Sequence, residues 1–130
     1  MKMTPNRYGF VAMLIWLFIL VFSIRTTPAY AQRTYWKVPL DTLAIGHFKH
    51  THVQTTGTVV YVLSETDGDI HIKLSSPSGR FIIAECIPKL PCIKPKAGTT
   101  ITVFGITRWD PEHVWAEVHP VESWFLVPSI

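Results

Sequence analysis

The arrangement of hydrophobic and polar residues changes near residue 32 of the chain. Phe10 to Ile24 form an apolar run of fifteen residues that only Ser23 interrupts. From His52 onward, apolar residues instead occur in short β-branched and aromatic stretches that turn residues separate. No segment after residue 32 shows the 3.6-residue period of an amphipathic helix. The pattern therefore predicts an N-terminal hydrophobic helix followed by an all-β domain.

Five strands are predicted in this domain, between residues 52 and 126. Ile70, Ile72 and Leu74 alternate with polar residues, which is the period of a half-buried strand. A long first strand bends near Gly57, and a proline-rich connection separates the third strand from the fourth. This layout predicts a small five-stranded Greek-key barrel of the OB-fold type, in which the fifth strand closes on the first. The strand signals are strongest over residues 58–63, 70–75, 80–86, 99–107 and 114–118.

Residues 32–51 form a lead-in segment before the predicted barrel. They carry Pro39 and Gly46 among scattered aromatic residues. We expect this segment to pack on the domain without regular structure. The chain then divides into an N-terminal hydrophobic segment (1–31), the lead-in segment (32–51) and the OB-fold-like domain (52–126).

The N-terminal segment has the composition of an export signal. Lys2 and Arg7 precede the apolar run, and Ala29 and Ala31 supply the small residues for cleavage after Ala31. The alternative is a retained anchor, in which residues 8–25 span the inner membrane. Both interpretations place the basic N-terminus in the cytoplasm. We therefore expect an exported domain, periplasmic or secreted, that contacts the membrane only through the N-terminal segment.

The expected exported part differs in charge from the whole chain. The full chain has 12 Lys and Arg residues and 9 Asp and Glu residues, a net charge of +3. Lys2, Arg7 and Arg25 precede residue 32, so residues 32–130 hold nine basic and nine acidic residues and are formally neutral. Non-specific nucleic-acid binding rests on phosphate neutralisation by Lys and Arg. The neutral charge of residues 32–130 therefore argues against a nucleic-acid partner, although a local basic patch is still compatible with it.

The two cysteines, Cys86 and Cys92, lie six residues apart in the segment ECIPKLPC. An exported domain folds in an oxidising compartment, where an even cysteine count indicates a disulfide. The alternative is a pair of free, partly buried thiols. A zinc site is not predicted, because no second cysteine or histidine pair has the spacing of a zinc finger.

Three stretches of the sequence resemble a known group of proteins. They are GTVVYVLSETDGDIHIKL, FIIAECIP and GITRWDPEHVWAEVHPVESW. Together they resemble the small bacterial exported OB-fold proteins described as nucleic-acid-binding-like, over residues 53–124. This resemblance implies the fold rather than an established activity.

Asp67, Asp69 and His71 alternate at a spacing of two, which places them on one face of an extended segment. Two carboxylates and an imidazole are suitable ligands for a divalent metal. The simpler interpretation is a tight turn, since Asp side chains in Asp-Gly-Asp cap backbone amides. The turn is favoured, and the same residues stay candidates for ligand binding.

Glu85 lies within an otherwise apolar strand, so its carboxylate needs a partner. Glu117 and His119 share one face of the last predicted strand. We expect Glu85, His71, Glu117 and His119 to converge as one polar cluster near a barrel end. The cluster would be either a hydrogen-bonded network that fixes the strand register, which is favoured, or a ligand or metal site.

Trp109 follows Arg108 in a loop that would flank the ligand face of an OB-fold, together with loop 65–69. The indole could stack on a base or a sugar ring, and the guanidinium could add a cation–π contact. The alternative is that the aromatic residues of this stretch fill the barrel and cover its ends.

These features predict an exported OB-fold binding module without a cofactor. The sequence does not identify its ligand, and nucleic acid or another envelope component is a candidate. One alternative is a protein–protein accessory module of the cell envelope. Another is a metal-dependent enzyme, because the DGD turn resembles that of secreted nucleases related to staphylococcal nuclease. After residue 33 the only arginines are Arg80 and Arg108, and no G-x-S-x-G or His-Glu-x-x-His motif is present. A non-enzymatic module is therefore favoured.

Overall fold

The computed structural model describes residues 33–90 and 92–130. The predicted N-terminal hydrophobic segment, residues 1–31, lies outside the described residues. Within the described part of the chain, no helix is both long enough and apolar enough to span a membrane.

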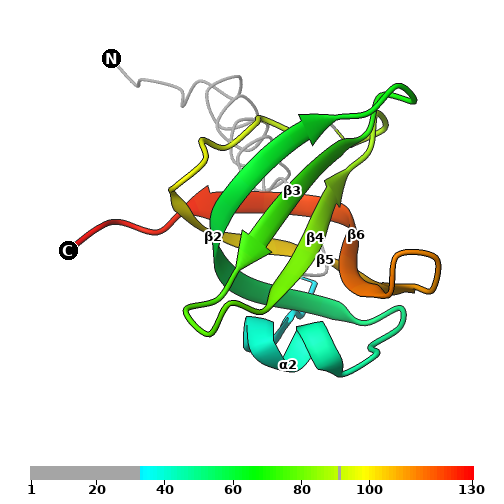
Figure 1. Cartoon of the computed structure of the whole chain (residues 1–130), viewed down its shortest axis with the longest axis horizontal. Coiled ribbons are helices and arrows are strands. Elements are labelled where there is room, and N and C mark those ends of the chain that lie inside the picture. The colour runs from blue at the N-terminus through cyan, green and yellow to red at the C-terminus, as the bar shows by residue number, and fades with distance from the viewer. Residues whose placement is uncertain (1–32, 91) are drawn as a thin grey trace, which may run out of the picture. The chain divides into compact units, whose positions relative to one another are not determined.

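The described residues form a closed β-barrel of five strands, with one short additional strand (Figure 1). This confirms the predicted all-β OB-fold. The barrel strands are β2 (His52–Ser64), β3 (Ile70–Ser75), β4 (Phe81–Cys86), β5 (Thr100–Asp110) and β6 (Trp115–Leu126). The last strand is longer than the predicted stretch 114–118: β6 continues through Pro120 to Leu126, because the proline lies in a bulge, where a ladder hydrogen bond is not required.

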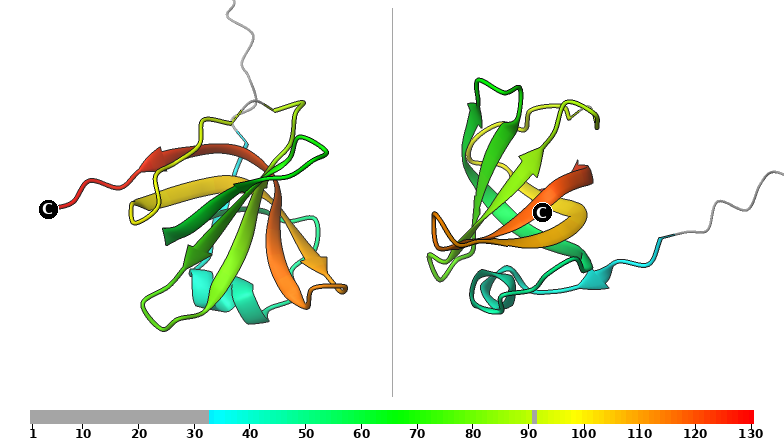
Figure 2. Two further views of the ribbon diagram at one scale, coloured as in Figure 1. Left: turned by 45° about the horizontal axis from the view of Figure 1, so that its top comes forward. Right: turned by 90° about the vertical axis from the view of Figure 1, so that its right-hand side faces the viewer.

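The strand order around the barrel corrects one predicted contact. β6 pairs with β5 in antiparallel fashion and with β4 in parallel, rather than with the first barrel strand. Closure comes from the pairing of β2 with β5, over His52–Thr58 and Thr100–Ile106. β2 is long enough to pair with β5 along its first half and with β3 along its second half. The strong curvature of β2 that this requires is visible in Figure 2.

The lead-in segment is more regular than the sequence predicted. β1 (Trp36–Lys37) pairs in parallel with β2, and α2 (Leu40–Ile45) packs against β4, β6 and β2 at one end of the barrel. Leu40 and Leu43 of α2 are buried in the core. A helix of six residues is too short to show a helical period, but its two leucines have the i, i+3 spacing of one helix face.

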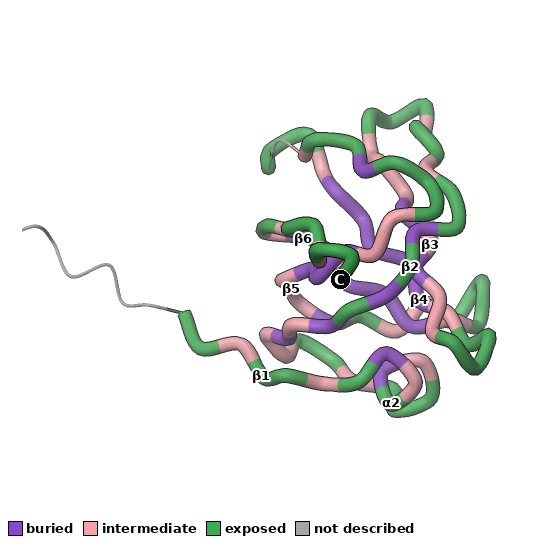
Figure 3. Tube along the Cα trace, turned by 90° about the vertical axis from the view of Figure 1, so that its left-hand side faces the viewer, coloured by how far each residue is buried: buried purple, intermediate pink, exposed green. Residues whose placement is uncertain are grey.

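The core lies on the inner side of strands whose residues alternate in and out (Figure 3). Ile72 and Leu74 of β3, and Ile82 and Ala84 of β4, point inward and are fully buried. The intervening residues of these strands carry most of their polar groups, and they point to the opposite side of the sheet.

Cys86 at the end of β4 forms a disulfide with Cys92, which confirms the predicted pairing. The bond ties the end of β4 to the connection that leads to β5. Trp124 of β6 also holds this connection, because its indole N–H donates a hydrogen bond of 2.9 Å to the carbonyl of Ile93.

Candidate ligand-binding face

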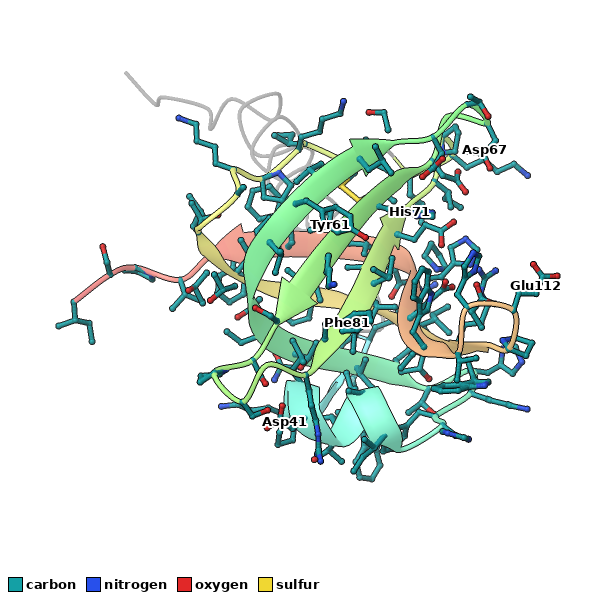
Figure 4. The ribbon with its side chains drawn as sticks, in the orientation of Figure 1. Asp41, Tyr61, Asp67, His71, Phe81 and Glu112 are labelled. Atoms are coloured by element: carbon teal, nitrogen blue, oxygen red, sulfur yellow. A yellow bond between two sulfur atoms is a disulfide. The ribbon has the colours of Figure 1, made fainter. Side chains whose placement is uncertain are left out.

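The strand register gathers polar and aromatic side chains on the outer side of the sheet. Residues directly opposite one another on neighbouring strands point to the same side. One continuous row of paired residues crosses the barrel and consists of Tyr61, Lys73, Ile83, Glu117 and Arg108. A second row consists of Leu63, His71 and Glu85. We call this surface the outer face; Figure 4 labels Tyr61, His71 and Phe81, which belong to it.

A bulge in β6 brings His119 into this region. Gly105 pairs with Val121 and Thr107 pairs with Val118, so His119 and Pro120 together oppose the single residue Ile106. A β-bulge redirects the side chain of its extra residue. Gly105 permits the close approach, because a Cβ at this position would overlap the carbonyl oxygen of Pro120 and come within 2.6 Å of Val118.

Glu117 is buried and has short partners at both carboxylate oxygens. Arg108 donates from Nε to Oε2 at 2.8 Å, and its Nη2 lies 2.6 Å from the same oxygen. The indole N–H of Trp115 donates to Oε1 at 2.8 Å. These distances are those of charge-assisted hydrogen bonds. Glu117 is therefore a satisfied buried carboxylate that fixes Arg108 and Trp115 on the outer face.

Glu85 is equally buried but lacks such partners. Its Oε1 lies 3.5 Å from Nε2 of His71 and 3.6 Å from Nε2 of His119. Its Oε2 lies 3.7 Å from Nη2 of Arg108 and has no hydrogen-bond partner within the described part of the chain. Heavy-atom distances of 2.7–3.2 Å are usual for hydrogen bonds between such groups. The Glu85 carboxylate is thus surrounded by partners that stay too far away for close contact.

Burial sets the protonation behaviour of this cluster. It raises the pKa of Glu85 to about 7. The Asp69 carboxylate, with which only a protonated Glu85 can share a hydrogen bond, and the charge of Glu117 act in the same direction, while Arg108 opposes them. Burial also lowers the pKa of His119, and the positive charge of Arg108 adds to that lowering. Near pH 7 the cluster therefore carries less charge than its composition implies.

Asp69 completes the group on the loop side. One ligand atom from each of Asp69, Glu85 and His119 lies within 4.8 Å of the others. Asp67, by contrast, is exposed, and its Oδ1 accepts a hydrogen bond of 3.0 Å from the backbone N–H of Asp69. In Figure 4 Asp67 lies at the tip of the β2–β3 loop. Asp67 shapes the turn, and Asp69 is the carboxylate that reaches the cluster.

The predicted cluster residues Glu85, His71 and His119 thus lie together, and Arg108 links Glu117 to Glu85. We call Asp69, His71, Glu85 and His119 the Glu85 cluster. The His71 Nδ1 atom lies 3.7 Å from Oε1 of Glu65, so a second carboxylate lies on the side of the imidazole opposite Glu85.

Aromatic side chains occupy the other half of the outer face. The Phe81 and Trp115 rings meet edge to face, with centroids 6.2 Å apart. The Lys73 ammonium lies 4.0 Å from the Phe81 centroid and 5.9 Å from that of Tyr61. Tyr61 is 40% exposed, and His113 stacks on Trp115 at 4.5 Å. This half offers ring faces beside a cation.

Trp109 does not belong to this face. It pairs with Ala116, so it points to the side opposite Arg108, packs against the core and stacks on His47 with centroids 3.9 Å apart. Sequence reasoning did not single out Lys73 and Phe81. Their places could have been found from the alternation, since Lys73 lies between two core residues, Ile72 and Leu74.

Comparisons with known proteins show the fold but no family. No protein-family model matches the chain, and no curated protein matches it either. Asparaginyl-tRNA synthetase from Pyrococcus horikoshii aligns at 17% identity and a TM-score of 0.58, over 75% of this chain and 24% of the synthetase. A putative aspartyl-tRNA synthetase from Leishmania major Friedlin aligns at 11% identity and a TM-score of 0.57, over 88% of this chain and 26% of that protein.

The second OB-fold domain of replication protein A from Methanococcus maripaludis also aligns, at 16% identity over 64% of this chain and 90% of that domain. Its TM-score of 0.48 is too low to support an inference. The chain spans about a quarter of the length of the synthetases that it matches. At these identities the likeness to the synthetases shows a shared fold and leaves the ligand undetermined.

Proposed function

We propose that this chain is an exported, non-enzymatic OB-fold binding module that takes a short single-stranded nucleic acid on its outer face. The observation that carries the proposal is the group of aromatic rings on that face, Tyr61, Phe81 and Trp115, with the Lys73 ammonium between two of them. OB-folds bind oligonucleotides and oligosaccharides on this side of the barrel. Bases stack on aromatic side chains with little regard to sequence.

The position of the rings supports this function better than the position of Trp109 does. Tyr61 is exposed, and Trp115 is half-buried and held in place by its hydrogen bond to Glu117. A fixed ring loses less conformational entropy on binding than a mobile one. The proposed contacts are therefore Tyr61, Phe81 and Trp115 for bases, with Lys73 and Arg108 toward phosphates.

The charge of the face limits the expected affinity. Lys73 and Arg108 are its cations, and Arg108 already faces Glu117. If each neutralised one phosphate, the logarithm of the affinity would fall with the logarithm of salt concentration with a slope no steeper than about −1.4. We therefore expect modest binding that depends mainly on stacking.

The test is titration of the purified full chain with short oligothymidine and oligouridine, followed by tryptophan fluorescence. Tyr61→Ala is expected to weaken binding by about 1–3 kcal/mol, as for loss of one stacked base. Trp36→Ala is the matched control, because Trp36 is 71% exposed on β1, away from the outer face. Equal affinity in wild-type and Tyr61→Ala chains, or binding of a neutral oligosaccharide in place of the oligonucleotides, would overturn the proposal.

A second candidate is the metal-dependent nuclease-like enzyme. It is favoured by one observation, that two carboxylates, Glu85 and Glu117, lie beside Arg108. The Arg108 guanidinium, however, directs Nε and Nη2 to Glu117. The negative charge of Glu117 therefore offsets the positive charge that Arg108 could present to a phosphate. Incubation of the chain with labelled oligonucleotide and Mn²⁺ or Ca²⁺ decides between the two: we expect binding without cleavage. Cleavage that Arg108→Ala abolishes would establish the enzyme instead.

A further inference from the structure

We propose that the Glu85 cluster is a binding site for one divalent transition-metal ion of the Zn²⁺ type. Its ligands would be Glu85, His119 and Asp69, whose donor atoms lie within 4.8 Å of one another, together with His71, which lies 3.5 Å from Glu85. This inference does not depend on the proposed nucleic-acid ligand, because it rests on the other half of the outer face and is tested with metal alone.

The first argument is the spacing of the donor atoms. Glu85 Oε1 lies 3.5 Å from His71 Nε2 and 3.6 Å from His119 Nε2. Both distances are too long for a good hydrogen bond. Zinc takes nitrogen and oxygen ligands at about 2.0–2.1 Å in a tetrahedron, whose edges are then about 3.3–3.4 Å. Glu85 Oε1 is thus separated from each imidazole nitrogen by nearly the distance that an ion between them requires, and one donor atom each of Asp69, Glu85 and His119 lies within 4.8 Å of the others.

The second argument is the state of Glu85 itself. Its side chain is only 6% exposed, and its Oε2 has no hydrogen-bond partner among the described residues. An unsatisfied buried carboxylate destabilises a fold, so such a group in a native structure calls for an explanation. A cation bound by both oxygens of the Glu85 carboxylate would supply the missing partner of Oε2. Arg108 cannot do so from 3.7 Å while it holds Glu117 at 2.6 Å.

The third argument is that two other carboxylates of the chain, Asp110 and Glu122, each have a partner at hydrogen-bond distance. Asp110 and His113 meet at 2.7 Å, and the Tyr35 hydroxyl donates to Glu122 at 2.7 Å. A purely structural network around Glu85 would be expected to contract in the same way. Its ligands instead come from β3, β4, β6 and the β2–β3 loop, whose register and bulge hold them apart.

The donor types select the class of ion. Two imidazole nitrogens with carboxylate oxygens suit Zn²⁺, Fe²⁺, Co²⁺ or Ni²⁺, whereas Mg²⁺ and Ca²⁺ prefer oxygen alone. Glu65, 3.7 Å from the Nδ1 atom of His71, is placed as an outer carboxylate that would orient the imidazole. The half-buried positions of His71, His119 and Asp69 leave the site open to solvent on one side.

The experiment titrates the purified full chain with Zn²⁺ in competition with a chromophoric chelator, and separately with Co²⁺ while its visible absorption is recorded. We expect one equivalent of Zn²⁺ with a Kd of about 1 μM or tighter. Co²⁺ should show absorption bands that Zn²⁺ then removes. Glu85→Gln and His119→Gln should each weaken Zn²⁺ binding by about 10–100-fold or more.

The matched controls are His113→Gln and Glu122→Gln, which remove the same residue types from places outside the cluster. Both should bind Zn²⁺ as the unchanged chain does. If Glu85→Gln fails to fold, His119→Gln decides the question, because His119 lies in a bulge at the rim of the cluster. Absence of saturable Zn²⁺ binding overturns the proposal. Binding that the two cluster variants leave undiminished, or that His113→Gln weakens equally, also overturns it.

Discussion

At the β5–β6 turn, Asp110 and His113 form a contact of 2.7 Å, whereas the histidines around Glu85 stay 3.5 and 3.6 Å from its carboxylate. The turn pair is three residues apart in sequence, and its imidazole is 56% exposed, so the histidine can move toward the carboxylate. The Glu85 cluster draws its members from separate strands, and its central carboxylate is buried.

The difference shows that side-chain composition does not determine whether a histidine and a carboxylate pair directly. The Asp110–His113 pair lies in one short turn, where Asp110 also accepts backbone hydrogen bonds from Glu112 and His113, so the two side chains meet at hydrogen-bond distance. A pair whose Cα positions are fixed by strand register can be held open, at a cost in stability, and such a cost at one place is typical of a functional site. The following experiments test this difference between the two regions.

The largest effect is expected from Gly105→Ala. The new Cβ would overlap the Pro120 carbonyl and crowd Val118, so the bulge that places His119 would have to move. We expect a loss of unfolding free energy of about 3 kcal/mol, measured by urea denaturation. Gly79→Ala is a control without a steric neighbour, although its positive φ of 86° adds some backbone strain. A Gly105→Ala chain as stable as the Gly79→Ala chain would contradict this account of the bulge.

Arg108→Ala should have the next largest effect. Glu117, 3% exposed, would lose its hydrogen bond to Nε and its ion pair, and Glu85 would lose its nearest cation. Because Arg108 is 44% exposed, water can replace part of this interaction. We expect a loss of about 2–3 kcal/mol in unfolding free energy.

Arg80→Ala is the control for Arg108→Ala, since Arg80 is exposed and its charge acts on Asp41 at the surface. Its effect should stay within about 0.5 kcal/mol. Similar losses in the two arginine variants would show that Glu117 does not depend on its buried ion pair.

Glu85→Gln and Glu122→Gln should change stability in opposite directions in metal-free protein at pH 8. Removing the charge of Glu85 relieves a buried carboxylate that lacks a hydrogen-bond donor, so the variant should gain about 1 kcal/mol. Glu122 accepts a hydrogen bond from Tyr35 and contacts His52 at 3.3 Å, so its variant should lose about 1 kcal/mol. Urea denaturation with a chelator present measures both. A marked loss in Glu85→Gln would show that its open geometry already stabilises the fold.

The sequence was sufficient to predict the barrel and the meeting of Glu85 with His71. Both follow from period-two alternation, because opposite residues of adjacent antiparallel strands share a face. The proximity of His119 to Glu85 was also expected from the sequence. The bulge that carries it there was not, since it depends on the exact register between β5 and β6 and on the close approach at Gly105.

Other features depended on details that no local pattern contains. The side to which Trp109 points is set by the β5–β6 register, which places it opposite Ala116 and away from Arg108. The short helix α2 forms because Leu40 and Leu43 are buried against one end of the barrel. Its stability therefore comes from tertiary packing rather than from helix propensity. The approach of Asp69 to Glu85 depends on the turn at Asp67. The hydrogen bond from Asp67 to a backbone amide was predicted, but the direction in which the turn points the Asp69 side chain was not.

The smallest effect, and the most direct measure of the contrast, is the titration of the two histidines. A hydrogen bond to Asp110 raises the pKa of His113 above its usual 6.5, while burial and the charge of Arg108 lower the pKa of His119 below it. The carboxyl of Asp110 has a lowered pKa for the same reason that His113 has a raised one. NMR of the imidazole C–H protons in metal-free protein should therefore show His113 titrating at higher pH than His119.

The pair of Asp110 and His113 should make the stability of the fold depend slightly on pH. The raised pKa of His113 contributes stability that is complete below the unfolded value of 6.5 and is lost as pH rises through the folded value. The lowered pKa of Asp110 contributes stability that is complete above 3.8 and is lost as pH falls through the folded value. His113→Gln should remove the upper limb of this dependence and leave the titration of His119 unchanged. If it moved the His119 midpoint as well, the turn pair and the Glu85 cluster would be one coupled system rather than two independent arrangements.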